Sequence, residues 1–61
     1  MGIKVDERVE ALNDAMPGCK KGDQGVCTGL YACDSEPYIT VKLDNGNEPG
    51  MRLEANWKKV E

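Results

Sequence analysis

Three cysteines, Cys19, Cys27 and Cys33, are the side chains best suited to covalent or metal chemistry. They are separated by seven and by five residues, so the chain has no Cys-x-x-Cys pair, and it has no histidine. Redox motifs and structural zinc sites use closely spaced cysteines, and a cysteine nucleophile needs a neighbouring base. The spacing therefore predicts no metal site and no thiol catalysis. We expect Cys27 to be a small buried apolar residue and Cys19 and Cys33 to be exposed near loops; a Cys19–Cys33 disulfide stays an open alternative.

Carboxylates are the second group that could do chemistry, since the chain has eleven Asp and Glu residues. Acid–base catalysis needs two carboxyl groups in a cleft that separates their pKa values. A chain of 61 residues has a small core and offers little burial for such a pair. We therefore expect no catalytic residue and no cofactor, and a protein that is not an enzyme.

The formal net charge of −3 disfavours nucleic acid as a partner, because binding to phosphates uses clustered Lys and Arg side chains. The alternative would require six cations to gather on one face: Lys20, Lys21, Lys42, Arg52, Lys58 and Lys59. Strand alternation predicts that Lys42 and Arg52 both point outward. The pairs Lys20-Lys21 and Lys58-Lys59 are typical of solubilising surface.

The elements that must position these side chains are short strands. Residues Tyr38–Leu43 alternate strictly, with Ile39, Val41 and Leu43 on one face and Tyr38 on the other. The Asn45-Gly46 pair that follows predicts a hairpin turn of type I′, in which both central residues have positive φ. Pro37 is expected to mark the strand entry after a loop.

Four further strands and one turn complete the predicted order. Residues Val5–Leu12 have a composition that also suits a short helix, but the breakers that follow favour a strand. Gly29 inside the next strand indicates a bulge or a barrel kink. The predicted elements are a strand at 5–12, a loop at 13–22, strands at 26–33, 38–43 and 51–54, a 3-10 turn at 55–57 and a last strand at 58–60. Five short strands predict an all-β fold in one domain, residues 1–61: a small barrel or sandwich.

Three segments together resemble the Src-homology-3 (SH3) family. Ala11–Ala15 resembles its Ala-Leu-Tyr-Asp-Tyr strand, Lys20–Asp23 its diverging turn, and Ala55–Val60 its closing 3-10 turn and last strand. The segments 22–27 and 41–46 also resemble bacterial SH3-like barrels, including the KOW module of ribosomal and transcription factors. The resemblance implies a five-stranded SH3-like barrel with a short 3-10 turn before the last strand. It does not imply proline-peptide binding, since Asn13 and Ala15 replace the two motif tyrosines and most groove aromatics are missing.

The remaining candidates are the aromatic residues, and they favour a contact surface. Tyr31 and Tyr38 are expected to face outward, with Trp57 as a core or rim anchor beside them. The loops 13–19 and 44–50 are expected to complete this surface. The prediction is a protein-interaction module or accessory subunit with another protein as its partner; the alternative is a KOW-like RNA- or DNA-binding module. Residues 1–6 have no apolar targeting core, and no apolar run approaches the roughly 20 residues that span a bilayer. We therefore expect a cytoplasmic monomer or weak dimer, of a size that suits a bacterial or phage accessory protein.

Overall fold

One antiparallel sheet of five strands forms the fold in the computed structural model, which describes residues 2–60. The strands are β1 (Arg8–Ala11), β2 (Gln24–Cys33), β3 (Glu36–Leu43), β4 (Arg52–Leu53) and β5 (Trp57–Lys59), and a 3-10 turn, η1 (Glu54–Asn56), precedes β5. Their order across the sheet is β4-β3-β2-β1-β5. The predicted all-β class and the 3-10 turn before the last strand are confirmed, and the first segment is a strand, shorter than predicted.

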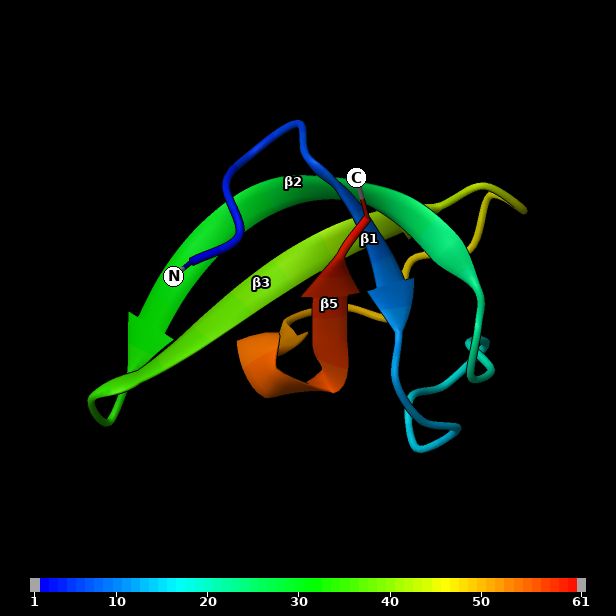
Figure 1. The fold of residues 1–61 in the computed structure, drawn as a ribbon. Coiled ribbons are helices and arrows are strands. Elements are labelled where there is room, and N and C mark those ends of the chain that lie inside the picture. Colours follow the sequence, from blue (N-terminus) through cyan, green and yellow to red (C-terminus); the bar gives the residue numbers. More distant parts are fainter. Residues whose placement is uncertain (1, 61) are drawn as a thin grey trace.

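The long β2–β3 hairpin dominates the shape of the molecule. Figure 1 shows β2 bending along its length, and the end of the hairpin extends at the lower left beyond β1 and β5. The predicted bulge lies within this strand, because the register between β2 and β3 shifts between Cys27 and Gly29. A bulge adds one residue to one strand and increases its local twist. The pairing of β2 with β1 ends just before this bulge, at Val26.

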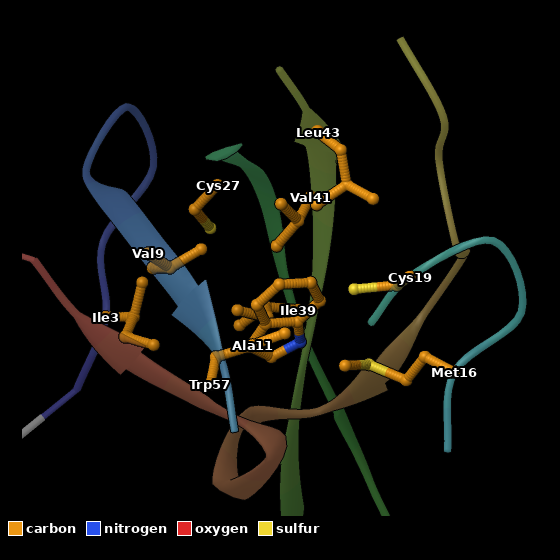
Figure 2. Close-up of a cluster of buried hydrophobic side chains, with 10 residues drawn as sticks. All are labelled: Ile3, Val9, Ala11, Met16, Cys19, Cys27, Ile39, Val41, Leu43 and Trp57. Carbon is orange, nitrogen blue, oxygen red and sulfur yellow. The ribbon is translucent and has the colours of Figure 1, made fainter. Parts of the chain in front are cut away.

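The core lies on one side of this bent sheet, which we call the core face; the other side is the outer face. Ile39, Val41 and Leu43 are buried there, as the alternation predicted, and they pack with residues from the rest of the chain. Figure 2 shows Met16 and Cys19 entering the cluster from the loop after β1, toward Ile39 and Trp57. Cys19 is 3% exposed, so the prediction of an exposed thiol was wrong. The loop closes the open side of the core, and this contact leaves no periodic signal in the sequence.

The type I′ turn lies at a different hairpin from the predicted one. Asp34 and Ser35 have φ values of 51° and 68°, and they alone connect β2 to β3. At the predicted position only Gly46 has a positive φ, of 92°. The Leu43 carbonyl accepts from the Gly46 N–H at 2.9 Å, and the Leu43 N–H donates to Asn47 at 2.9 Å. This is the pattern of a three-residue loop, a type I turn followed by a left-handed residue.

Replacing Ser35 with Gly is expected to raise the free energy of unfolding by about 1 kcal/mol. Ser35 holds a left-handed conformation that costs a residue with a Cβ about 1–2 kcal/mol, and the added flexibility of glycine offsets part of the gain. Urea unfolding would measure the change. Asn45→Gly is the control, because Asn45 has no positive φ to relieve; an equal gain there would contradict the explanation.

Candidate protein-contact surface

The two predicted contact tyrosines form a cross-strand pair on the outer face of the hairpin. Tyr31 on β2 lies opposite Tyr38 on β3. Tyr31 is 51% exposed, and Tyr38 is half-buried. Directly opposite side chains in a sheet share a face, and Tyr38 points away from buried Ile39. The sequence therefore predicted correctly that both rings lie outside the core.

One of these rings packs against the backbone of Gly29, next to the bulge. A Cβ at Gly29 would lie 2.9 Å from the Cε1 and Oη atoms of Tyr31 and 2.9 Å from Oγ1 of Thr40. The Tyr31 side chain therefore lies over the bare glycine backbone. Next to it, the hydroxyl groups of Thr28 and Thr40 are 2.9 Å apart and hydrogen-bonded. We call this uncharged group of five residues the tyrosine patch: Thr28, Gly29, Tyr31, Tyr38 and Thr40.

Trp57 does not join the tyrosine patch. It pairs with Ala11 on β5 and β1 and is 4% exposed, as part of the core. Its Nε1 is buried and has no hydrogen-bond partner within residues 2–60. Its edge borders a shallow groove of about 420 Å³ on the core face, lined in part by Ile3, Pro37 and Glu54. The expected aromatic group is therefore divided between the two faces of the sheet.

The six cations of the nucleic-acid hypothesis are also divided. Arg52 lies opposite Ile39 and therefore shares the core face with it, so its predicted outward position was wrong. Lys59 lies opposite buried Val9, whereas its neighbour Lys58 lies opposite Glu10. Lys42 points to the outer face, and Lys20 and Lys21 are exposed in the loop before β2.

Acidic groups pair with cations on both faces of the sheet. Arg8, which shares the outer face with Lys42 through Val26, forms an ion pair with Asp44 at 2.8 Å. Lys59 lies 3.1 Å from Glu7. The pKa of Glu7 is lowered, first by the hydrogen bond from the Lys4 backbone N–H and then by Lys59. Both faces are therefore mixed in charge, whereas phosphate binding needs a basic stripe.

The two predicted contact loops do meet. The Asn47 side chain donates a hydrogen bond of 3.1 Å to the Gly18 carbonyl, which joins the loop 44–50 to the loop 13–19. A shallow polar groove with Asp14, Asp23 and Asn45 on its walls lies between them. Its acidic walls distinguish it from the uncharged tyrosine patch at the other end of the hairpin.

All three cysteines are free, and burial distinguishes them. Cys19 and Cys27 lie in the core and Cys33 is exposed, so Cys27 has the predicted place. Desolvation raises the pKa of both buried thiols. No cluster of three or more metal-ligating side chains occurs in the described part of the chain. Within the same residues, no helix is long and apolar enough to cross a bilayer.

We predict that a thiol-alkylating reagent modifies Cys33 alone in the folded protein. The thiolate is the reactive form, and burial both disfavours it and blocks access at Cys19 and Cys27. Mass spectrometry after brief treatment at pH 8 should show one adduct, which Cys33→Ser removes. In denaturant three adducts should form. Rapid native labelling of Cys19 would contradict its burial.

Comparison with known proteins gives no match to a protein-family model, to a curated protein or to a solved structure.

Proposed function

We propose that the protein is a non-enzymatic protein-interaction module, an accessory subunit that works in the cytoplasm as a monomer or weak dimer. One observation carries the proposal: the protruding end of the β2–β3 hairpin exposes uncharged side chains on both faces. Tyr31 is 51% exposed on the outer face, and Leu30, which points the other way, is 50% exposed. Aromatic and apolar residues at the centre of an exposed patch are typical of protein contacts.

An SH3-like barrel is the fold that we propose for this bent sheet. Supporting it, the segment that resembles the diverging turn does form a turn: the Asp23 N–H donates to Lys20 at 2.9 Å, and Gly22 has a φ of 93°. The segment that resembles the closing 3-10 turn and last strand contains η1 and β5. In this frame the tyrosine patch lies on the outside of the barrel.

Affinity capture with paired variants tests the proposed function. The wild-type protein, the double variant Tyr31→Ser/Tyr38→Ser and the control Lys20→Ser/Lys21→Ser would each be immobilised in extract from the native host. A protein recovered by the wild type and the control, but lost with the tyrosine variant, is the expected result. Recovery of the same proteins by all three forms would overturn the proposal. Nucleic acid lost with the lysine control would instead favour the KOW-like alternative.

A further inference from the structure

The part of β2 that follows Cys27 has an open edge on the side away from β3, where no other strand of the described chain pairs with it. β1 pairs with β2 only through Gln24–Val26, and the segment just before β1 adds two backbone hydrogen bonds, which join Cys27 to Asp6 at 2.8 Å and to Glu7 at 2.9 Å. Beyond Cys27, β2 has β3 on one side, and no strand within residues 2–60 pairs on the other. We call Gly29–Cys33 the open edge. In Figure 1 this is the part of β2 that extends at the lower left.

Two residues of the open edge direct their backbone groups away from the sheet. Cys33 and Glu36 flank the two-residue turn, so they exchange the two hydrogen bonds that close it. In an antiparallel ladder the next pair does not bond internally. By this alternation Ala32 and Leu30 present their N–H and C=O groups to the free side. The spacing of these groups matches that of one added strand.

The two edges of the hairpin differ in their protection. On β3, Pro37 lies opposite Ala32 in a pair that does not bond internally. Its nitrogen, which carries no hydrogen, therefore points away from β2 in the plane of the sheet. Proline and charged residues are common devices that prevent strand addition. The open edge has neither, because Thr28–Cys33 contains no charged residue and no proline. The structure therefore leaves one side of the hairpin, and not the other, competent to accept a strand.

The charges at the two ends of the open edge indicate what kind of strand fits. Asp34 follows directly after Cys33, and exposed Asp6 is bonded to Cys27 at the other end. If a second copy paired antiparallel about Tyr31, its Asp34 would lie opposite Thr28, next to Asp6. Like charges at such positions destabilise pairing. A strand with basic residues at both ends would instead be attracted to the acidic side chains that repel a second copy.

We propose that the open edge binds an extended peptide segment of another protein as a sixth strand, with an uncharged alternating middle and a basic residue at each end. This inference rests on the proposed function and names its mode of recognition. Backbone hydrogen bonds to Leu30 and Ala32 hold the segment. The exposed side chains of Leu30 and Tyr31, on opposite faces, contact its alternate residues.

Amide-resolved NMR with a defined probe tests the proposal. The probe is the peptide Lys-Thr-Val-Thr-Val-Thr-Lys with blocked ends; the controls are the same peptide with glutamate at both ends and the same peptide N-methylated at both valines. The lysine peptide should shift the amides of Leu30 and Ala32 and slow their hydrogen exchange. Both controls should bind at least about tenfold more weakly than the lysine peptide, since each loses roughly 1.4 kcal/mol of binding free energy.

Matched protein variants complete the test. Ala32→Pro removes one edge N–H and leaves the bonds to β3 in place, so it should weaken the lysine peptide about tenfold. Ala32→Ser keeps the N–H and should bind as the wild type does. If Ala32→Pro loses its dispersed spectrum, Leu30→Lys, which adds a charge at the same edge, replaces it.

Three results would overturn the inference: no shift at about 1 mM lysine peptide, equal binding of the glutamate peptide, or self-association through the same amides without peptide. If one of them occurs while capture still depends on the tyrosines, the proposed function stands and only the strand mode fails. Loss of both would reject the contact surface itself.

Discussion

Replacing Val41 with Asp is expected to abolish the folded state. Val41 is 1% exposed, lies opposite Cys27 and is among the largest fully buried side chains. Burial of an unpaired carboxylate costs several kcal/mol even after relaxation. A domain of this size has a total stability of only roughly 3–9 kcal/mol. The free-energy cost of burying the introduced carboxylate therefore matches or exceeds the total stability of the folded protein.

The adjacent position provides the control for this experiment. Lys42 is exposed on the outer face, so Lys42→Asp changes the charge more than Val41→Asp does but buries nothing. Amide dispersion and thermal unfolding by circular dichroism would compare the two. We expect a disordered spectrum for Val41→Asp and a cooperative transition for Lys42→Asp. A cooperative Val41→Asp protein would show that the core face is assigned to the wrong side.

Gly25→Ala is expected to destabilise the protein by about 3 kcal/mol. A Cβ at Gly25 would meet the Lys42 carbonyl oxygen and would lie 2.8 Å from Cα of Leu43. These are backbone atoms of the paired strand, so no rotamer change can relieve the overlap. The two strands would have to separate where Gly25 pairs with β1 as well as with β3.

Gly29→Ala is the matched control in the same strand. The three atoms nearest to its new Cβ belong to the ends of side chains, the Thr40 hydroxyl and the Tyr31 ring, and these can rotate. We expect a loss below about 1 kcal/mol. Urea unfolding of both variants measures the difference. Similar losses would refute the argument from backbone crowding.

Two parts of the fold could be predicted from local sequence signals, an alternation of apolar residues and a glycine inside a strand. The Ile39, Val41 and Leu43 alternation identified the core face, and Gly29 identified the bulge. The Asp34-Ser35 turn was missed because neither residue is glycine and Pro37 indicated a loop. Proline is tolerated in β3 because its nitrogen faces the β4 side of the strand, where β4 pairs with Tyr38 and Ile39 but not with Pro37. Sequence does not display this property of strand pairing.

The candidate surface was predictable only in part. Alternation assigned both tyrosines to the outer face, since β3 is long enough for its pattern to be read. Arg52 belongs to a strand of two residues, and its face depends on the pairing with Ile39, not on any pattern of its own. The open edge had no sequence signal either, because it depends on where β1 ends relative to β2.

The β2–β3 and β1–β5 pairings differ greatly in the length of chain that they close. Cys33 and Glu36 are joined by two residues, whereas Val9 pairs with Lys59 near the other end of the chain. The entropic cost of closing a loop grows with its length, so the β2–β3 hairpin is expected to form early in folding and the β1–β5 pair late. The folding nucleus would then be the same hairpin that carries the proposed contact surface. Substitutions in its turn should change the folding rate, and substitutions in β5 should mainly change the unfolding rate.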